Sequence, residues 1–359
     1  MINTSNTVTS QTVGVAMSGG VDSTVAAAML LEQGYAVHGF FMKLPLPGVN
    51  EQIRKVQEVA DRLRIPLYFV DMEKEFTARV INYFCHEYCQ GRTPNPCVVC
   101  NQAIKFGLLT KAMRTQGIDR TASGHYVGIA QIAQHRETPL LQRGKDLKKD
   151  QSYFLCRLSS QQLQQSLFPL AGYLKKEILL QAKDLGFTHF EGDESQDVCF
   201  LAPKNKQDKQ DLASFLGQQG ILGMKGEIVT QDGQVMGTHE GIWKYTVGQR
   251  RGLGLPDATP WYVIGLHADR NQVIIGKNDA LFRRELTLSD MQWQLELPIP
   301  WQGKVQLRSC HQAAAAEVRP TENGNWRVCF QAPQRAVTPG QFAVLYQDDL
   351  VVGSGVIVR

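Results

Sequence analysis

The stretch VAMSGGVDST, residues 15–24, places glycines, hydroxyl residues and an aspartate where an apolar run meets a helix-like one. Glycine permits close approach and positive φ, so the amides of such a loop can converge on an anion. The helix that follows adds the positive end of its dipole. Residues 18–20 and Ser23 are therefore expected to cradle a phosphate, with Asp22 holding Mg²⁺ or orienting the loop. The loop has neither the Walker spacing nor the dinucleotide fingerprint. A capped strand–helix turn is the simpler alternative.

A second cluster, CHEYCQGRTPNPCVVC at residues 85–100, holds four cysteines and a histidine. The spacing of Cys97 and Cys100 matches a zinc knuckle, so a structural zinc site is one interpretation. The first two cysteines are four residues apart, which puts them on one helical face and suits partly buried positions. Cys100 directly precedes the helical run 101–117, and a thiol at a helix N-terminus is stabilised as the thiolate. A nucleophile at Cys100 is the other interpretation.

Two further segments have less specific signals. Cys199, in ESQDVCFLAP, is interpreted from its local sequence as a buried structural thiol. The run WKYTVGQRR, residues 243–251, mixes aromatic and basic side chains that can stack on bases and contact phosphates. A glycine-rich hairpin with solvated arginines is the alternative for this run.

The composition is that of an ordinary soluble globular protein. The chain has 359 residues, a net charge of +4, 20% charged and 43% hydrophobic residues, and eight cysteines. The N-terminal stretch MINTSNTVTSQT lacks the features of a signal or transit peptide, and no apolar run approaches a membrane span. A cytoplasmic protein is therefore expected. In that compartment cysteines are reduced, metal-bound or catalytic more often than disulfide-bonded.

The elements that must position these residues alternate between strands and helices over the first 125 residues. Apolar runs predict strands at 13–17, 36–42 and 66–70, and periodic runs predict helices at 22–34, 51–64 and 75–90. This alternation predicts an α/β domain with a doubly wound parallel sheet. Ligands in such sheets bind at the carboxyl ends of the strands, where residues 18–22 would lie.

After about residue 205 the pattern becomes β-rich. NKQDKQD is a polar linker, and the glycine-rich stretch 217–265 predicts a small domain of strands and turns. From about residue 283, the segments GKVQLRS, NWRVCFQ, QFAVLY and VVGSGVIV predict a small β-barrel or sandwich.

Several longer motifs then establish a resemblance. AMSGGVDST, GRTPNPCVVCNQAIKF, ASGHY, KDQSYFL, SQDVCF, GIWKYTVGQRRGLG and TPGQFAVLY occur in this order. SGGVDS by itself resembles the loop of the N-type ATP pyrophosphatases, which cleave ATP between the α and β phosphates and adenylate a carbonyl oxygen. Together the motifs resemble the bacterial tRNA-specific 2-thiouridylases, the MnmA/TrmU family, from about residue 13 to the C-terminus.

The resemblance implies an N-type ATP pyrophosphatase domain at 1–205, a small central β-rich tRNA-binding domain at 206–282 and a C-terminal β-barrel at 283–359. It implies ATP, Mg²⁺ and tRNA as ligands. The wobble uridine of tRNAs for Lys, Glu and Gln would be adenylated on its carbon-2 oxygen. Sulfur from a cysteine desulfurase or a sulfur-relay protein would arrive as a persulfide, giving 2-thiouridine, AMP and pyrophosphate.

The resemblance also implies individual roles, by position within the motifs. Cys100 would be the nucleophile, Cys199 would carry the persulfide, and the two would form a transient disulfide. ATP would be bound by Ala16, Met17, Ser18, Gly19, Gly20, Val21, Asp22, Ser23, Met42 and Gly124. The target base and the tRNA would be contacted by Asn95, Pro96, Cys97, His125, Lys149, Asp150, Gln151, Arg308, Ser309 and Gln341.

The chain departs from the family pattern at three places. Cys97 stands where some members have an aspartate, which leaves the acid/base group unassigned. The segment LPLPGVNEQ is shorter than in relatives, and RSC at 308–310 replaces a frequent Arg-Tyr pair, which weakens the assignment at Ser309. In another mechanism, Cys97, Cys100 and Cys199 would hold a [4Fe–4S] cluster with one iron open to sulfide.

Two other functions account for parts of the sequence. A ligase that adenylates a small carboxylate would use the SGGVDS loop but leave the cysteines and the β domains without a role. A metal-binding RNA protein without catalysis would use the cysteine cluster alone. Binding of unmodified tRNA and metal analysis separate these alternatives from the thiolation enzyme.

Overall fold

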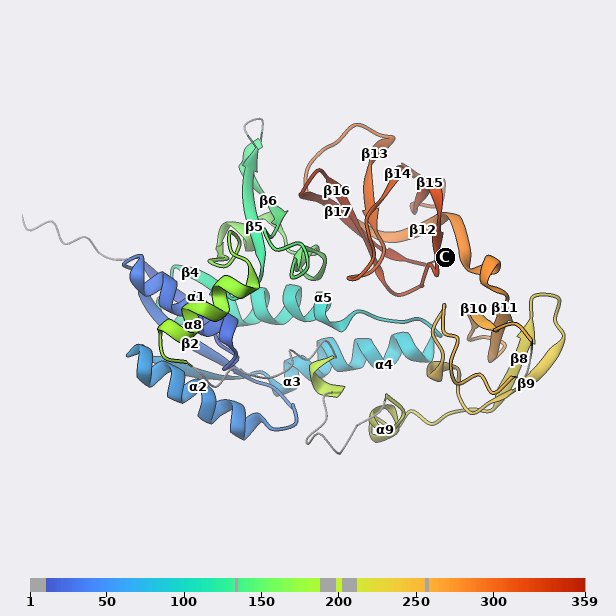
Figure 1. The fold of residues 1–359 in the computed structure, drawn as a ribbon, viewed down its shortest axis with the longest axis horizontal. Helices are drawn as coiled ribbons and strands as arrows, with labels where there is room; N and C mark the ends of the chain where they lie inside the picture. Colours follow the sequence, from blue (N-terminus) through green and yellow to red (C-terminus); the bar gives the residue numbers. More distant parts are fainter. Residues whose placement is uncertain (1–10, 133–134, 188–197, 202–211, 256–257, 359) are drawn as a thin grey trace, which may run out of the picture. The chain divides into compact units, whose positions relative to one another are not determined.

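A computed structural model describes residues 11–132, 135–187, 198–201, 212–255 and 258–358 (Figure 1). The chain folds as two compact units. The first comprises Met1–Lys74, Asn101–Ser152 and Leu158–Glu194, and the second comprises Glu75–Cys100, Tyr153–Arg157 and Ser195–Arg359. None of the helices in these described ranges has the length and apolar character needed to span a bilayer.

The first unit is built on a five-stranded parallel sheet with the strand order β3-β2-β1-β4-β7. Its strands are β1 (Thr12–Ala16), β2 (Ala36–Lys43), β3 (Leu67–Asp71), β4 (Arg120–Ser123) and β7 (Ser166–Leu167). The strand order reverses at β1, because β2 lies on one side of it and β4 on the other. The carboxyl ends of β1 and β4 therefore border the crevice where such sheets bind ligands. The predicted α/β fold is confirmed.

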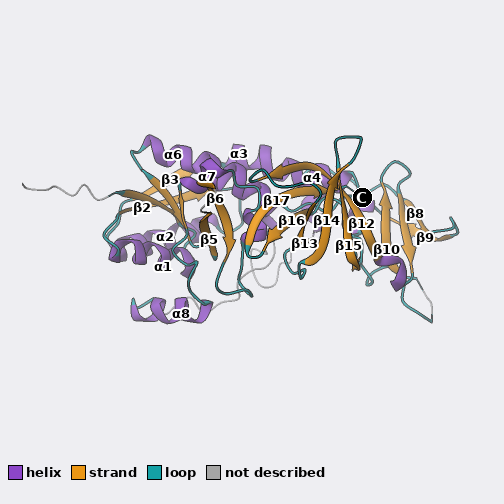
Figure 2. Ribbon diagram, turned by 90° about the horizontal axis from the view of Figure 1, so that it is seen from above, coloured by secondary structure: helices purple, strands orange, loops and turns teal. Residues whose placement is uncertain are grey.

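Helices cover both faces of this sheet. They are α1 (Val21–Glu32), α2 (Val49–Leu63), η2 (Asn101–Leu109), α6 (Thr110–Thr115), α7 (Ser160–Gln164) and α8 (Lys175–Asp184). Figure 2 shows α1, α2 and α8 on one side of the sheet and α6 and α7 on the other. A Cβ atom on Gly14 of β1 would lie 2.8 Å from the sulfur of Met113, so the sheet packs closely on α6. A hairpin of β5 (Val127–Ile132) and β6 (His135–Arg143), absent from the sequence-based prediction, follows β4.

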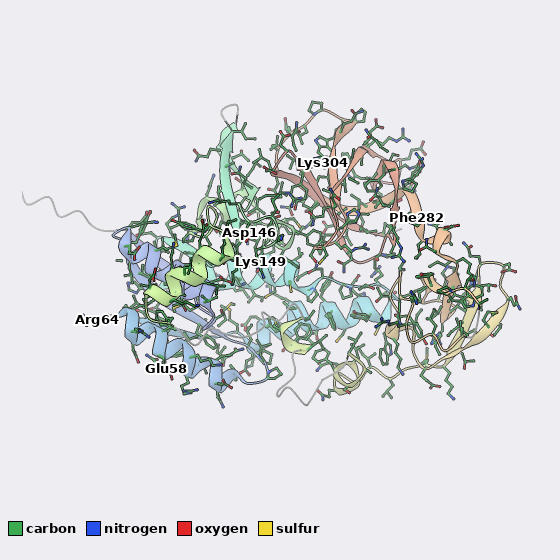
Figure 3. The ribbon with its side chains drawn as sticks, viewed as in Figure 1. Glu58, Arg64, Asp146, Lys149, Phe282 and Lys304 are labelled. Carbon is green, nitrogen blue, oxygen red and sulfur yellow. The ribbon has the colours of Figure 1, made fainter. Side chains whose placement is uncertain are left out.

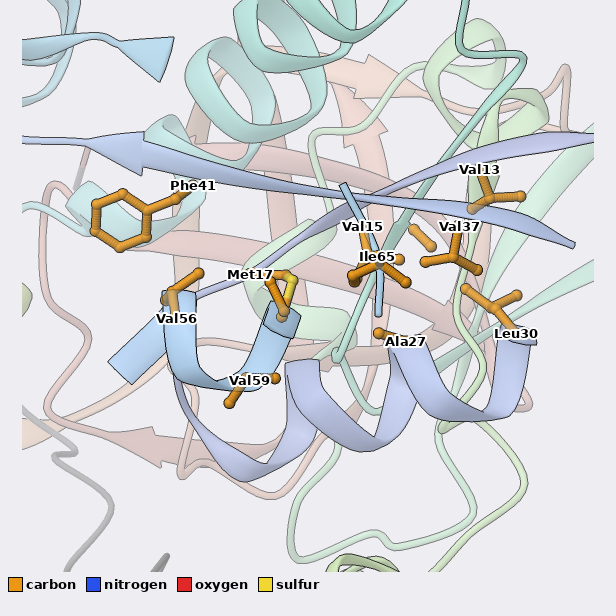
Figure 4. Packing of buried hydrophobic residues seen from close by; sticks show 12 residues of the cluster. Val13, Val15, Met17, Ala27, Leu30, Val37, Phe41, Val56, Val59 and Ile65 are labelled. Carbon is orange, nitrogen blue, oxygen red and sulfur yellow. The ribbon is translucent and has the colours of Figure 1, made fainter. Parts of the chain in front are cut away.

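The face of β1 that points away from α6 forms the main core of the unit (Figure 4). Val13 and Val15 alternate with Gly14 along the strand, and both are fully buried. They belong to one cluster with side chains of α1 and α2, among them Ala27, Leu30, Val56, Val59 and Ala60. Ile53 and Leu63 pack at its margin. The periodic apolar residues of the helix predicted at 51–64, namely Ile53, Val56, Ala60 and Leu63, thus face the core, and the helix is confirmed.

The second unit begins at Glu75, within a helical segment that consists of α3 (Glu73–Phe76), η1 (Thr77–Ile81) and α4 (Asn82–Cys89). The sequence predicted a helix at 75–90 here. A short helix, α5 (Pro96–Cys100), follows and starts five residues earlier than predicted. The reason is local: the Asn95 side chain accepts a hydrogen bond from the Val98 N–H at 3.4 Å, and Pro96 occupies the first helical position, where its missing N–H costs nothing. Cys100 is therefore the last residue of α5 and is followed directly by the π-helix η2 (Asn101–Leu109). It lies within a continuous helical stretch, so the prediction of a helix N-terminus at Cys100 is wrong.

The remainder of the second unit is β-rich, as predicted. Four strands, β8 (Gly226–Thr230), β9 (Val235–His239), β10 (Tyr262–His267) and β11 (Gln272–Gly276), form a sheet in the order β10-β11-β8-β9. Six antiparallel strands form the C-terminal part, namely β12 (Phe282–Trp293), β13 (Trp301–Gln306), β14 (Ala314–Pro320), β15 (Trp326–Arg335), β16 (Phe342–Gln347) and β17 (Leu350–Ile357). Pairing of β12 with β17 closes these six strands, which makes the structure a barrel and not a sandwich. The linker NKQDKQD lies outside the described residues.

The short elements of the two units are η3 (Ser152–Leu155), η4 (Cys199–Leu201), α9 (Leu212–Gln218), η5 (Ile242–Lys244) and η6 (Asn278–Leu281).

Gly124 provides a test of the junction between β4 and α1. A Cβ atom there would lie 2.6 Å from the carbonyl carbon of Asp22 and 2.7 Å from the Ser23 nitrogen, which are backbone atoms. We expect Gly124→Ala to reduce the free energy of unfolding by about 1–3 kcal/mol, because the first turn of α1 must move. Chemical denaturation measures this change. Gly172→Ala, where no atom lies within 4 Å of the new Cβ, is the matched control. Equal stability of the two variants would contradict the close packing.

Candidate active site

The loop between β1 and α1 has the backbone shape of an anion cradle. Gly19 has φ +77°, a conformation that side chains rarely adopt, and a Cβ there would approach Val56 Cγ2 to 3.1 Å. Gly20 is extended and precedes the first turn of α1. Both Ser18 and Gly20 are exposed. The loop therefore presents accessible backbone and a serine hydroxyl at the positive end of a twelve-residue helix, and these groups fit a phosphate.

Hydroxyl groups support this loop from inside. Ser23 Oγ donates to the Gly20 carbonyl at 3.0 Å and accepts from the Ser18 N–H at 3.3 Å. Thr24 Oγ1 donates to the same carbonyl at 3.0 Å. Ser23 is only 5% exposed. Its hydroxyl thus fixes the curvature of the loop.

Asp22, the residue whose charge opposes phosphate binding, is neutralised by two distant residues. Lys175 Nζ, at the start of α8, lies 2.8 Å and 2.9 Å from the two carboxylate oxygens. The Tyr126 hydroxyl donates to Oδ1 at 2.7 Å. The Lys175 side chain is 13% exposed, so this pair is only partly screened by solvent. The structure therefore adds a cation and a hydroxyl donor to the edge of the loop.

The other residues predicted for ATP lie near the same sheet edge but contribute in different ways. Met42 is the second-last residue of β2 and is partly exposed. Gly124 follows β4 and packs against the backbone at the start of α1. The side chains of Met17 and Val21 point into the core, so only their backbones are available to a ligand. Ala16, the last residue of β1, is partly exposed.

In the second unit, the segment leading into α5 is held by the C-terminal barrel. Gln341 Nε2 donates to the carbonyls of Thr93 and Pro94 at 2.8 Å and 3.3 Å. The Thr93 N–H donates to the Pro339 carbonyl at 2.9 Å. A Cβ atom on Gly340 would lie 3.0 Å from the Thr93 backbone. The residues immediately before Asn95, Pro96 and Cys97 are thus clamped by the TPGQ motif.

The sequence predicted a tRNA contact at Gln341, and this remains a prediction. Its side-chain nitrogen is already engaged by backbone carbonyls, and its oxygen accepts from the Tyr153 hydroxyl at 3.4 Å. The contacts in the structure make Gln341 a residue that positions the cysteine-bearing helix.

Cys199 lies on η4 and is exposed, so its interpretation as a buried structural thiol is wrong. Its neighbour Phe200 is buried instead. The Phe200 ring centroid lies 5.0 Å from those of Phe84 and Phe215 and 6.0 Å from that of Phe76. Phe76 and Phe84 belong to the helical segment 73–89, and α5 packs against η1 of that segment. Cys100 and Cys199 are therefore carried by elements that pack on the same helical segment.

The cysteines differ in their accessibility. Cys97 and Cys100 are partly exposed, whereas Cys85 is buried. Burial and the adjacent Cys89 raise the pKa of Cys85 to about 11, and burial raises the pKa of Cys156 to about 12. All eight cysteines are thiols. Within the described ranges, no three His, Cys, Asp or Glu side chains are placed to share a metal ion. The described residues therefore assemble neither the zinc site considered for residues 85–100 nor the three-cysteine iron–sulfur site.

The residues predicted to contact tRNA in the first unit are more enclosed than expected. Asp150 accepts four hydrogen bonds, from Arg143, the Gly144 N–H, and the N–H and hydroxyl of Ser152, at 2.6–3.1 Å. The Gln151 side chain accepts from the Tyr126 N–H at 3.0 Å. Lys149, labelled in Figure 3 together with Asp146, is partly exposed. Of these three, only Lys149 offers a cation to a phosphate.

His125 is 8% exposed, and its Nδ1 lies 2.8 Å from Ser123 Oγ. Burial, with a smaller contribution from Lys105, holds the pKa of His125 well below its usual value. The imidazole is therefore neutral at pH 7, and any contact with tRNA would be made without a positive charge.

Among the candidate RNA contacts in the β-rich part, some side chains are buried and others are accessible. Trp243 and Tyr245 are each 8% exposed, so the prediction that they stack on bases is wrong. Arg250 and Arg251 are exposed, as the alternative of solvated arginines requires. Residues 243–251 form the end of the 3-10 helix η5 and turns, so the hairpin of that alternative is wrong. Arg308 is partly exposed and Ser309 is exposed in the loop after β13. Gln306 Nε2 donates to both of their carbonyls, at 3.1 Å and 3.0 Å.

Comparison with known proteins covers nearly the whole chain. Family models match the tRNA methyl transferase HUP domain at residues 11–203, the PRC-barrel domain of the same family at 213–277 and an aminomethyltransferase beta-barrel domain at 283–357. The tRNA-specific 2-thiouridylase MnmA of Desulfotalea psychrophila is 46% identical over 348 residues, which cover 96% of this chain and 98% of the relative. The proteins of the same name from Syntrophotalea carbinolica and Koribacter versatilis are 41% and 40% identical, and the alignments cover 95% and 96% of this chain and 97% and 98% of those proteins.

The chain belongs to the tRNA-specific 2-thiouridylase family. Its first unit contains the nucleotide-binding type of parallel-sheet domain that the HUP match denotes.

Sequence reasoning missed two residues of this family member, Lys175 and Tyr126. Tyr126 lies in the ASGHY motif and was passed over for its neighbours. Lys175 starts a helix with the sequence KKEILL, and nothing in this sequence distinguishes Lys175 from the neighbouring Lys176, which is exposed. The unpartnered charge of Asp22 was the available signal, because a carboxylate beside a phosphate site requires a cation.

Lys175→Met tests the neutralisation of Asp22. We expect this variant to bind Mg²⁺–ATP about 10- to 100-fold more weakly, because a charge-assisted contact from Lys175 to a phosphate oxygen is worth about 1.5–3 kcal/mol. Isothermal titration calorimetry measures the affinity. Lys176→Met is the matched control and should bind as the parent does. Equal affinities for both variants would remove Lys175 from the site.

Gln341→Ala tests the clamp on the residues before α5. Loss of its two hydrogen bonds should raise hydrogen exchange in the peptide covering residues 93–100 by about 5- to 30-fold, which corresponds to about 1–2 kcal/mol. Gln302→Ala, on the exposed surface of β13, is the control. Unchanged exchange with weakened tRNA binding would instead support the direct tRNA contact predicted from the sequence.

Proposed function

We propose that this chain is an ATP-dependent tRNA 2-thiouridylase that converts the wobble uridine of tRNAs for Lys, Glu and Gln to 2-thiouridine. The observation that carries the proposal is the near full-length relationship to proteins named tRNA-specific 2-thiouridylase. The geometry supports it because one unit holds a phosphate-type loop and the other holds accessible thiols.

The nucleotide half of the reaction would use the loop after β1. The Ser18 hydroxyl and the backbone N–H groups in the first turn of α1 would hold the phosphates of ATP, and the α1 dipole would stabilise the departing pyrophosphate. Lys175 lies close enough to Asp22 to exchange between this carboxylate and a phosphate oxygen. Mg²⁺ would be held by Asp22 together with the phosphates of ATP, since magnesium takes one or two carboxylates and completes its shell with phosphate and water.

Adenylation is needed because the carbon-2 oxygen of uracil is a poor leaving group. Transfer of AMP to this oxygen gives an activated carbon from which AMP can leave. The target base must leave the anticodon stack to reach the loop, at a cost of a few kcal/mol. Asn95, Pro96 and Cys97, at the start of α5, would surround the extruded base.

The sulfur half would use the two thiols. A desulfurase or relay protein would leave a persulfide on Cys199, and its terminal sulfur would attack carbon 2 as AMP departs. The Cys100 thiolate would then attack Cys199 Sγ, which breaks the bond to the transferred sulfur. The products are 2-thiouridine and a Cys100–Cys199 disulfide, and the electrons balance because one disulfide bond replaces another.

Cys199→Ser separates the two halves. The parent chain, supplied with ATP, an unmodified tRNA transcript and a persulfide donor, should form 2-thiouridine detectable by nucleoside mass spectrometry. We expect Cys199→Ser to lose thiolation and keep tRNA-dependent pyrophosphate release, because only sulfur delivery is removed. Cys310→Ser, at an exposed cysteine of the barrel, is the control. Thiolation by Cys199→Ser at the parental rate would refute the assigned role, and pyrophosphate release that ignores tRNA would favour a small-molecule ligase.

A further inference from the structure

Cys97 and Cys100 lie one turn apart on α5, and no redox role has been given to Cys97. Asn95 and Pro96 start the helix, which places Cys97 in its first turn and Cys100 at its last residue. Both thiols are partly exposed. The pair is therefore open to reagents and held in one short piece of helix.

Helix geometry brings the two residues within bonding reach. Residues three apart in an α-helix share a face, and the 1.5 Å rise with a radius of about 2.3 Å separates their Cα atoms by about 5 Å. Disulfides join residues whose Cα atoms are about 4.4–6.8 Å apart. A bond between Cys97 and Cys100 thus requires side-chain rotation and no transport of the backbone.

The other cysteines of the structure differ in accessibility or in spacing. Cys85 and Cys89 also share a helix, but Cys85 is buried. Burial, with a smaller contribution from the nearby Cys89, raises the pKa of Cys85 to about 11. Thiol exchange requires the thiolate, so this pair reacts slowly at neutral pH. Cys85 and Cys89 therefore provide an internal control pair for Cys97 and Cys100.

We propose that Cys97 and Cys100 form a reversible dithiol–disulfide pair that resolves the disulfide left by sulfur transfer. This use of the pair rests on the proposed function. The Cys97 thiolate attacks Cys100 Sγ, the bond from Cys100 to Cys199 breaks, and Cys199 leaves as a thiolate that takes up the proton lost by Cys97. No net electrons are exchanged in this step. A dithiol reductant of the thioredoxin class then supplies two electrons and two protons to the Cys97–Cys100 disulfide and becomes a disulfide itself.

Resolution on α5 frees Cys199 for the next persulfide before any external reductant acts. The reductant then meets a partly exposed helical turn. In some relatives an aspartate stands at this position and is a candidate acid/base group. The proposal gives Cys97 a resolving role instead.

Disulfide mapping tests the pair in the isolated full-length chain, independently of tRNA. The chain is equilibrated in buffers of increasing glutathione disulfide content, alkylated and digested with trypsin. The peptide TPNPCVVCNQAIK, residues 93–105, carries both cysteines, and VINYFCHEYCQGR, residues 80–92, carries the control pair. As oxidation proceeds, we expect the first peptide to appear without either alkyl group and two hydrogens lighter than its dithiol form. Dithiothreitol should reverse this change. The second peptide should keep both alkyl groups. Two alkyl groups on the first peptide in every buffer, or glutathione attached to Cys100 instead, would overturn the proposal.

Turnover at limiting reductant tests the resolving step. The readouts are 2-thiouridine formed per chain and the disulfide that each chain then holds, with and without added dithiothreitol. Without dithiothreitol, we expect both the parent and Cys97→Ser to stop near one product per chain, because Cys100 ends in a disulfide in both. The parent should then hold the Cys97–Cys100 disulfide with Cys199 as a thiol, whereas Cys97→Ser should hold the Cys100–Cys199 disulfide, and dithiothreitol should restore several turnovers to both. Cys89→Ser is the control, which should hold the same disulfide as the parent. A Cys100–Cys199 disulfide in the spent parent would overturn the resolving role. Absence of any 2-thiouridine from the parent would instead refute the proposed function, and the mapping result would then decide the dithiol pair alone.

Discussion

A negative charge beside an anion-binding loop is the constraint on which the first unit depends. Asp22 stands in the first turn of α1, where the helix dipole stabilises it but where it repels phosphate. Lys175 and Tyr126 remove that repulsion, and they come from positions 153 and 104 residues away in the chain. The loop therefore becomes suited to an anion only after β4, the segment that follows it and α8 have packed around α1. Local sequence makes the cradle, and tertiary folding sets its charge.

A similar dependence operates in the second unit. The segment that leads into α5 carries the motif NPCVVC, yet its backbone carbonyls are held by Gln341 of the barrel and its Thr93 hydroxyl contacts Thr246 at 3.3 Å. The β-rich part of the chain thus fixes the start of the helix that carries Cys97 and Cys100. This arrangement joins TPGQ and GRTPNP, two motifs that are more than 200 residues apart in the chain.

Burial determines which thiols are available. Cys85 and Cys156 are buried, and burial raises the pKa of both thiols so that they hold their protons. Cys199 is accessible because Phe200, the next residue, takes the buried position among Phe76, Phe84 and Phe215. The buried aromatic ring beside Cys199 fixes the position of the thiol without enclosing it.

The sequence by itself determined the elements whose signals are local. The first three strands of the parallel sheet, the glycine loop, the apolar face of α2 and the β-rich second half all follow from periodicity and turn residues within short windows. The short strands β4 and β7 were not predicted. The start of α5 was also present locally, in Asn95–Pro96, and was overlooked beside the longer run after Cys100. Only the tertiary structure decided that Lys175 neutralises Asp22, that Gln341 holds Thr93 and Pro94, that Cys199 is exposed and that Trp243 and Tyr245 are buried. These outcomes depend on which side chains meet across distant segments, and a side chain's burial or charge partner is a property of the packed chain that no short window contains.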